Sequence, residues 1–287
     1  MNYRHAFHAG NFADVHKHCI LVRVLLHLRL KPAGFRVIDT HAGSGRYDLS
    51  GPEAARSGEW HQGIERLWRA AQSQAAPDLL QPYLDAVAAL NPGGELRHYP
   101  GSPLIAKSLL RPQDRLVACE LEPGSAAALA AALRGDRRAK ALTIDGWMAA
   151  AAYVPPPERR GLVLVDPPFE ATDDFTQLSN VLASAHRKWP SGIYLLWYPI
   201  KDRQAPDALA RRLRRLPVPN ALRSELTLGP PRAEGGLVGS GLVVVNPPYT
   251  LEQDLGALMP ALCRLLSPEA AARTDWLVSE QSRGGHG

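Results

Sequence analysis

The chain has 287 residues, of which 45% are hydrophobic and 21% are charged, as in an ordinary globular protein, and its formal net charge is +5. It contains no run of about 18 uncharged apolar residues, which excludes a transmembrane helix, and its N-terminus lacks the apolar core of a secretory leader. Three scattered cysteines fit reduced thiols, so we expect a cytoplasmic protein with no membrane role, and the positive charge is compatible with a nucleic-acid partner without establishing one.

The first predicted element is a helix over residues 12–30, and its wide apolar side predicts that much of it is buried. Strands follow, and helical stretches such as residues 123–134 and 173–188 separate most of them. This alternation predicts a mostly parallel sheet with helices on both faces. The seven predicted strands cover residues 35–39, 115–120, 140–145, 161–166, 192–199, 222–228 and 241–246.

A long gap of about seventy residues separates the first two strands. A simple strand–helix–strand step needs only about 30 residues, and the excess contains two segments with helical periodicity, HQGIERLWRAAQSQ and PDLLQPYLDAVAALN. We therefore predict a small inserted helical subdomain. The predicted division is an N-terminal cap segment with the first part of the α/β domain (1–47), the inserted helical subdomain (48–98), the remainder of the α/β domain (99–280) and a flexible tail (281–287).

Residues 226–246, LTLGPPRAEGGLVGSGLVVVN, predict a hairpin between the last two strands. In this architecture the last strand usually enters antiparallel, at an edge of the sheet. The predicted fold class is therefore α/β and Rossmann-like, with a seven-stranded, mostly parallel sheet whose last strand is antiparallel.

Polar residues follow the first four predicted strands. The first strand leads into DTHAGSGRYD, which contains His41, and the second ends in Glu120. The third leads into Asp145 and Gly146, and the fourth leads into Asp166. Because ligands of an open parallel sheet bind beyond the carboxyl ends of its strands, these residues are expected to surround one ligand.

These residue types suit S-adenosylmethionine. The small residues at 42–45 let the backbone approach a ligand closely, Glu120 can accept hydrogen bonds from both ribose hydroxyls, and Asp145 can accept one from the adenine amino group. In YPGSPLIAKSLL, Ser102 followed by Pro103 predicts a helix N-cap whose position would suit the carboxylate of the methyl donor. The joint pattern favours a class I methyltransferase.

The stretch GLVLVDPPFE suits methylation of an exocyclic amine, whose lone pair is delocalised into its ring. The carboxylate of Asp166 and the carbonyl oxygen of Pro167 can accept hydrogen bonds from the two N–H groups, and Pro168 stiffens the turn. Phe169 offers a face on which a flipped base can stack. Transfer then depends on alignment more than on acid–base chemistry, and it requires no metal.

A second stretch, GLVVVNPPYT, contains Asn-Pro-Pro-Tyr at residues 246–249, which offers the same kinds of acceptor and aromatic groups in sequence. If its strand is antiparallel, Asn246 lies at the opposite edge of the sheet from the donor, while residues 239–241 lie near it. We therefore predict that Asp166 is catalytic and that this echo is a stiff turn into a helix that begins near Leu251, with Tyr249 packed below the sheet.

The segments YRHAFHAGNFADVHKH, DTHAGSGRYD, YPGSP, CELEP, IDGW and VDPPFE together resemble the bacterial 23S rRNA adenine N6-methyltransferase family that modifies adenine-2030. The resemblance covers essentially the whole chain. It implies an S-adenosylmethionine-dependent, Rossmann-like methyltransferase that acts as a monomer on naked 23S rRNA and not on assembled ribosomes.

The resemblance also implies roles for individual residues. Asp166 matches the catalytic position, and Tyr3, His5 and Lys17 match an N-terminal cluster that closes over the target adenosine. The residues that match donor contacts or their surroundings are His18, His41, Ser102, Glu120, Asp145, Gly146 and Asp166.

Alternatives remain at two points. The histidines near the N-terminus could form a metal site, or a solvated surface, instead of a patch that faces the substrate; these are His5, His8, His16 and His18. For the function, the alternatives are methylation of DNA adenine or of a protein glutamine, a role in DNA utilisation, and an RNA-binding module without activity.

Overall fold

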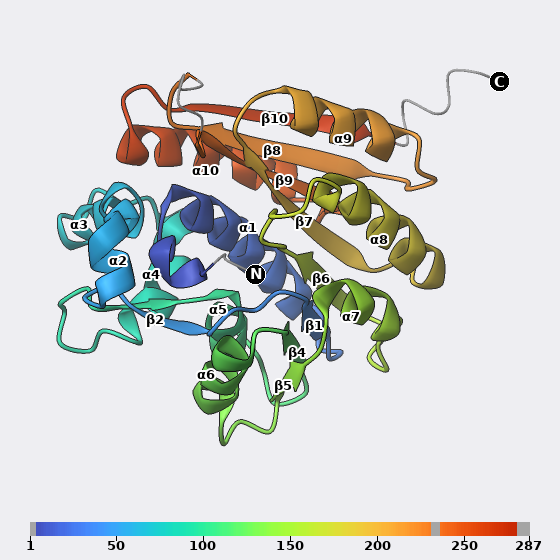
Figure 1. The fold of residues 1–287 in the computed structure, drawn as a ribbon, viewed down its shortest axis with the longest axis horizontal. Coiled ribbons are helices and arrows are strands. Elements are labelled where there is room, and N and C mark those ends of the chain that lie inside the picture. Colours follow the sequence, from blue (N-terminus) through green and yellow to red (C-terminus); the bar gives the residue numbers. More distant parts are fainter. Residues whose placement is uncertain (1–3, 231–235, 280–287) are drawn as a thin grey trace.

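The computed structural model describes residues 4–230 and 236–279 (Figure 1). At its centre these residues form an eight-stranded sheet in the order β10-β8-β9-β7-β6-β1-β4-β5. The last five strands in this order, from β7 to β5, run parallel to one another. Strand β9 is antiparallel to both β7 and β8, and β10 is antiparallel to β8. The strands are β1 (Arg36–Asp39), β4 (Arg115–Glu120), β5 (Ala139–Thr143), β6 (Gly161–Val165), β7 (Ile193–Ile200), β8 (Ala221–Thr227), β9 (Gly239–Val245) and β10 (Ala271–Val278).

Helices cover both faces of this sheet, which confirms the predicted α/β class (Figure 1). The face that carries Ile38, Val163 and Leu196 packs against α7 (Gly146–Ala152), α8 (Asp174–Lys188) and α9 (Gln204–Arg214). The face that carries Val37 and Leu164 packs against α1 (Phe12–Arg29), α5 (Ser102–Ser108), α6 (Pro123–Leu133) and α10 (Leu251–Leu266). The strands are therefore buried on both sides, as their continuous apolar runs require.

The predicted first helix is α1, and it is buried along most of its length. The side chain of Asn11 caps its N-terminus by accepting hydrogen bonds from the backbone N–H groups of Ala13 and Asp14. The helix also buries four polar residues, Asp14, His16, Lys17 and His18. Buried polar groups are costly without partners, so their contacts decide what this helix does.

The region between β1 and β4 contains the predicted helices. They are α3 (Ile64–Gln72) and α4 (Gln81–Ala88), and α2 (Pro52–Ser57), η2 (Glu59–Gln62) and η3 (Asp78–Leu80) accompany them. A two-stranded ribbon of β2 (Arg46–Asp48) and β3 (His98–Pro100) flanks these helices. Apolar side chains of this region, such as Ile64 and Leu84, join the same buried cluster as α1 and α10. The division of the chain at residues 48 and 98 stays a prediction, and the tail at 281–287 lies outside the described residues.

Two details of the predicted sheet are wrong. The seventh predicted strand, β9, is antiparallel as expected, but it lies between β7 and β8 and not at an edge. The edge is formed by β10, which was not predicted, because its residues AARTDWLV lack a sustained apolar run and most of them are partly or fully exposed.

Strand direction defines two edges of the sheet. The carboxyl edge is where β1, β4, β5, β6 and β7 end, and the amino edge is where they begin. Because β9 runs antiparallel to β7, it starts at the carboxyl edge, where Gly239 faces Ile200, and ends at the amino edge. The two Pro-Pro stretches consequently lie at opposite edges.

Candidate active site

A cavity of about 640 Å³ opens at the carboxyl edge of the sheet. It lies between the strand ends, α1 and the residues that precede α1, which we call the N-terminal segment (residues 4–11). Of the residues predicted for the site, those that line it are His5, Lys17, His18, His41, Ser102, Glu120, Asp145, Gly146, Asp166 and Pro167. The fold therefore gathers residues from widely separated parts of the chain at one place. Tyr3 lies outside the described residues, and Phe169 does not line the cavity.

The turn after β1 holds the acid that ends β4. The backbone N–H of Gly43 donates to Glu120 Oε2 at 2.9 Å, and the N–H of Glu122 donates to Oε1 at 2.8 Å. Gly43 has a φ of 60°, and a Cβ at this position would lie 2.1 Å from the hydroxyl oxygen of Tyr47. Glycine is thus required for both space and conformation, and the two N–H groups orient a carboxylate that keeps further lone pairs for a ligand.

His41 is held in a single tautomer by its neighbour. Thr40 Oγ1 donates its proton to the carbonyl oxygen of Leu164 at 2.9 Å and therefore accepts from His41 Nδ1 at 2.7 Å. Burial lowers the pKa of His41 to about 4, so the ring is neutral at pH 7. Its Nε2 consequently has a lone pair with which it can accept a hydrogen bond.

Asp145 and Gly146 form the start of α7 beside this histidine. Asp145 caps the helix by accepting a hydrogen bond from the N–H of Met148 at 3.1 Å, so one of its oxygens already has a structural role. A Cβ at Gly146 would lie 2.2 Å from the carbonyl oxygen of Thr40 and 2.6 Å from His41 Nε2. The backbone here approaches the turn after β1 more closely than any side chain allows.

Ser102 lines the cavity but does not cap a helix as predicted. The N-cap of α5 is Gly101, whose extended backbone has a ψ of 171°, and Ser102 is already the first helical residue, with Pro103 next. The sequence signal was offset by one position because serine and proline are common on both sides of a helix start. Ser102 is buried at the cavity wall.

Two buried polar side chains in this region have unused hydrogen-bonding atoms among the described residues: Asp39, which precedes the lining residue Thr40 in the chain, and His18, which lines the cavity. Neither carboxylate oxygen of Asp39, at the end of β1, makes a well-formed hydrogen bond, although the Ser102 side chain and the His41 backbone are near enough to favour its charged form. Burial outweighs them and raises the pKa of this carboxyl to about 7. The second group is Nε2 of His18, whose Nδ1 contacts the hydroxyl of Tyr99 at 2.7 Å. Such groups are rare in buried positions, and a bound ligand or a water molecule is what would supply the missing partner. Asp39 was noted at its strand end but was not assigned a role.

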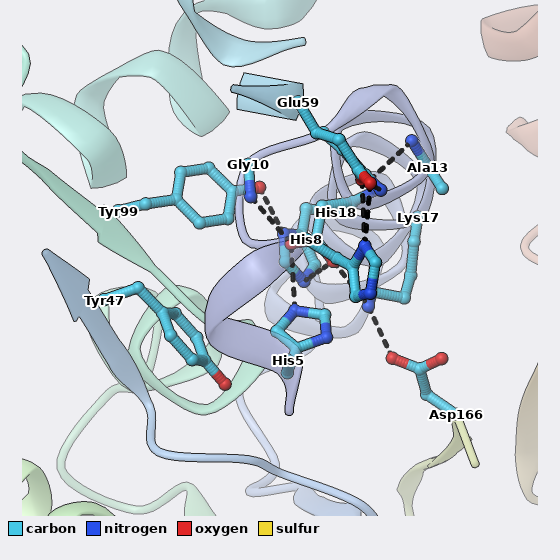
Figure 2. Close-up of polar contacts among 12 residues, drawn as sticks. His5, His8, Gly10, Ala13, Lys17, His18, Tyr47, Glu59, Tyr99 and Asp166 are labelled. Carbon is cyan, nitrogen blue, oxygen red and sulfur yellow. Dashed lines mark hydrogen bonds and ion pairs between the residues drawn. The ribbon is translucent and has the colours of Figure 1, made fainter. Parts of the chain in front are cut away.

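The side chain of Lys17, which projects from α1, contacts the carboxylate of Asp166, as Figure 2 shows. Its ammonium group donates to Asp166 Oδ2 and, at 2.8 Å, to Asp14 Oδ1. Burial opposes the positive charge, but the two carboxylates outweigh it and raise the pKa of Lys17. Asp14 was not predicted for the site, because nothing in the local sequence shows that residues 17 and 166 meet.

The four N-terminal histidines have separate surroundings and do not form one cluster. His8 pairs with Glu59 at 3.0 Å, and His16 lies in the core between Ser224 and Ser240, where burial lowers its pKa to about 3. Only His5 and His18 line the cavity. Across residues 4–230 and 236–279, no group of three or more potential ligands is placed to hold a metal ion.

Phe169 packs beside the cavity and not on its wall. Its ring centroid lies 4.8 Å from that of Phe175 and 5.6 Å from that of Trp197, and its φ of 51° turns the chain sharply after the two prolines. Pro167 and Pro168 reach the cavity instead. The predicted stacking face is close to Asp166 in the chain, but the ring is engaged with other aromatic residues.

The echo at residues 246–249 lies at the amino edge, as predicted. The amide of Asn246 donates to the carbonyl oxygens of Pro190 and Gly192, each at 2.7 Å, just before β7 begins. Helix α10 begins at Leu251, which confirms the predicted turn into a helix. The prediction for Tyr249 is wrong: its side chain is 83% exposed, and its ring makes a T-shaped contact with the ring of His27.

Comparison with known proteins agrees with this arrangement. The family model described as "Ribosomal RNA large subunit methyltransferase D, RlmJ" matches residues 32–278. The proteins named ribosomal RNA large subunit methyltransferase J from Haemophilus influenzae and Escherichia coli are each 39% identical to this chain, covering 98% of it and 100% of their own length. The crystal structure of a Legionella pneumophila protein is 32% identical, with a TM-score of 0.87, covering 93% of this chain and 98% of that one.

Within the described residues, no helix is both long and apolar enough to cross a membrane. The six sequence segments that carry the resemblance, the fold and the relatives agree with one another, which confirms the resemblance. The chain belongs to the RlmJ family of large-subunit ribosomal RNA methyltransferases.

Proposed function

We propose that this protein transfers a methyl group from S-adenosylmethionine to the N6 amine of one adenine in 23S rRNA, the adenine-2030 that the family resemblance implies. The observation that carries the proposal is the placement of Asp166 and Pro167 on the wall of the same cavity as Glu120 and His41. We further propose that the enzyme acts in the cytoplasm, as a monomer, on naked RNA.

The cavity fits the methyl donor. Glu120 keeps lone pairs for ribose hydroxyls, and Gly43 and Gly146 leave space that a Cβ would fill. Asp145 and His41 are acceptors for the adenine end, while Ser102 and His18 suit the carboxylate of the methionine end. When bound, S-adenosylmethionine would supply an electrophilic methyl group and leave as S-adenosyl-L-homocysteine, while the methylated amine would release one proton to solvent. No metal takes part in this proposal.

The catalytic role falls to Asp166. Lys17 engages its Oδ2, which leaves Oδ1 to accept a hydrogen bond from the target amine, and the carbonyl oxygen of Pro167 can accept the second. These two bonds favour a more tetrahedral nitrogen and aim its lone pair. Alignment of this kind supplies a large part of the rate in group transfer.

The base is held by its surroundings. We assign Tyr3 and His5 to the group of N-terminal residues that closes over the flipped adenosine. Lys17 is assigned to the same group and places a positive charge beside the base. Phe169 is assigned to the far side of the base, where stacking requires its ring to turn from Phe175 and Trp197. Flipping is least costly in RNA that is unpaired.

The test is methyl transfer from labelled donor to unmodified 23S rRNA fragments, with DNA and total protein as parallel acceptors. We expect label on N6 of a single adenine, mapped by nuclease digestion and mass spectrometry. Label in DNA or protein alone would replace the substrate assignment, and RNA binding without label would favour the module without activity.

A further inference from the structure

We propose that Asp14 is a positioning residue for methyl transfer that acts through Lys17. This inference rests on the proposed function, because it concerns the same cavity and deepens the account of how Asp166 is held. The observation is a chain of contacts from Asp14 to Lys17, both buried side chains of α1, and from Lys17 to the catalytic carboxylate of Asp166 after β6. Figure 2 shows the contact between Lys17 and Asp166.

The two oxygens of Asp14 have different tasks. Oδ2 accepts a hydrogen bond from the backbone N–H of Gly10 at 2.9 Å and lies 3.0 Å from Nε2 of His5, so it holds the N-terminal segment against α1. Oδ1 accepts from Lys17 at 2.8 Å and lies 4.0 Å from Nε2 of His18. One buried carboxylate therefore fixes both the segment over the cavity and the lysine that reaches Asp166.

The charges make Asp14 more than a local cap. The side chains of Asp14 and Lys17 are 2% and 4% exposed, and a buried charge that loses its partner is strongly disfavoured. Although burial opposes ionisation, the positive charge of Lys17 holds the pKa of Asp14 well below its ordinary value. Asp14 in turn is the largest influence that keeps Lys17 charged against its own burial.

The groups that face this pair come from several elements. On α1 they include His18, on the N-terminal segment His5, and after β6 Asp166. The positive charge of Lys17 also acts to lower the pKa of Asp39 at the end of β1 and of Tyr47 on β2, against the effect of burial. None of these groups replaces Asp14, because Asp166 is the only other carboxylate that contacts the ammonium among the described residues.

A structural explanation competes with this proposal. Asp14 occupies the first turn of α1 and accepts a backbone N–H just before the helix, which is what a capping acid does. If capping were its whole role, substitution would lower stability and leave the transfer rate per folded molecule intact. The two explanations therefore differ in rate and in pH dependence.

The experiment uses the full chain with S-adenosylmethionine and an unmodified 23S rRNA fragment, and it measures single-turnover transfer and donor Kd. Asp14→Asn is expected to slow transfer by about 100-fold, the scale of a misplaced functional group, with donor Kd changed by less than about threefold. Asn11→Ala is the matched control, because it removes the cap of α1 without touching Lys17, and it should keep the wild-type rate.

The pH profile is a second readout. In the wild type, Lys17 stays charged past the ordinary lysine pKa, and its raised value gives no alkaline loss of rate below about pH 10. In Asp14→Asn, burial acts on a lysine with one carboxylate left, so a falling limb should appear below that pH. Rates of Asp14→Asn equal to those of Asn11→Ala, with an unchanged profile, would overturn the proposal.

A double variant keeps the test decisive if Asp14→Asn alone does not fold. Removing both charges, as in Asp14→Asn with Lys17→Gln, leaves no unpaired charge inside α1. Asp166 keeps its carboxylate, but its side chain is 13% exposed at the open cavity, so this variant is expected to fold. If Asp14 acts through Lys17, the double variant transfers at the rate of Lys17→Gln, whereas a further loss of tenfold or more would contradict that route. A wild type that methylates no rRNA would instead refute the proposed function and not this inference.

Discussion

The two Pro-Pro stretches, residues 166–169 (DPPF) and 246–249 (NPPY), are similar in sequence and lie at opposite edges of the sheet. Each follows a fully buried strand, and each contains one non-glycine residue with positive φ, Phe169 at 51° and Asn246 at 53°. They differ because β6 ends at the carboxyl edge, whereas β9 is antiparallel and ends at the amino edge. Strand direction, and not the tetrapeptide, decides which one can meet a ligand.

Their polar groups are used differently as a result. Asp166 contacts the ammonium of Lys17 and faces the cavity. The side-chain amide of Asn246 donates hydrogen bonds to the carbonyl oxygens of Pro190 and Gly192, which fixes the start of β7. At the carboxyl edge, polar groups remain available for a ligand, whereas at the amino edge the amide of Asn246 forms hydrogen bonds within the protein.

Among the predictions for binding and stability, the largest expected effect is on donor affinity. Glu120→Ala should weaken the binding of S-adenosylmethionine by about 100-fold, because it removes acceptors for two hydroxyl hydrogen bonds. Isothermal titration calorimetry measures this directly. Asn246→Ala is the control from the other edge and should bind the donor like the wild type; equal losses in the two variants would erase the distinction between the edges.

The next effect concerns stability against pH. The raised pKa of Asp39 means that the folded protein loses stability as pH rises from about 4 to about 7, because the folded state resists ionisation that the unfolded state allows. Asp39→Asn should remove this loss, so its stability relative to the wild type should rise by roughly 4 kcal/mol between pH 4 and pH 8.

Urea unfolding at both pH values checks this prediction for Asp39. A parallel pH dependence in the variant and the wild type would show that Asp39 already has a partner in the free protein. Donor affinity, measured alongside, should fall in the variant if the open carboxylate serves the ligand.

Asn246 should matter for stability and not for chemistry. Asn246→Ala removes two hydrogen bonds and places alanine at positive φ, so we expect a loss of about 1–2 kcal/mol in the free energy of unfolding. Asn246→Gly keeps the backbone conformation and should lose less. If both variants were as stable as the wild type, the amide contacts at the amino edge would have no structural weight.

The smallest effect is expected at Tyr249. Its side chain is 83% exposed, so Tyr249→Ser should change the free energy of unfolding by no more than about 0.5 kcal/mol. Chemical denaturation is sufficient to measure this. A loss above 1 kcal/mol would restore the packed position that the sequence suggested.

Much of this arrangement could be predicted because it follows from local patterns. Apolar runs located the seven predicted strands, and the polar residues after them, such as Glu120 and Asp166, point to one edge by topology alone. The edge strand β10 escaped because its partly or fully exposed residues carry no apolar period. The offset at Ser102 and the exposure of Tyr249 depend on single backbone positions that composition does not determine.

Long-range contacts account for the rest. Asp14 meets Lys17 locally, but the contact of Lys17 with Asp166 joins positions 149 apart, and that of His16 with Ser240 joins positions 224 apart. No periodicity shows that His16 points into the core while His18, two residues later, faces the cavity. Such pairings arise only when the helix packs on the sheet.

The most direct measurement of the central claim compares the two Pro-Pro stretches in one assay. Single-turnover methyl transfer to an unmodified 23S rRNA fragment, at saturating donor, should fall by at least about 1,000-fold in Asp166→Ala, with donor binding weakened but present. The same assay should give Asn246→Ala a rate close to the wild type. Full activity in Asp166→Ala, or a comparable loss in Asn246→Ala, would contradict the account.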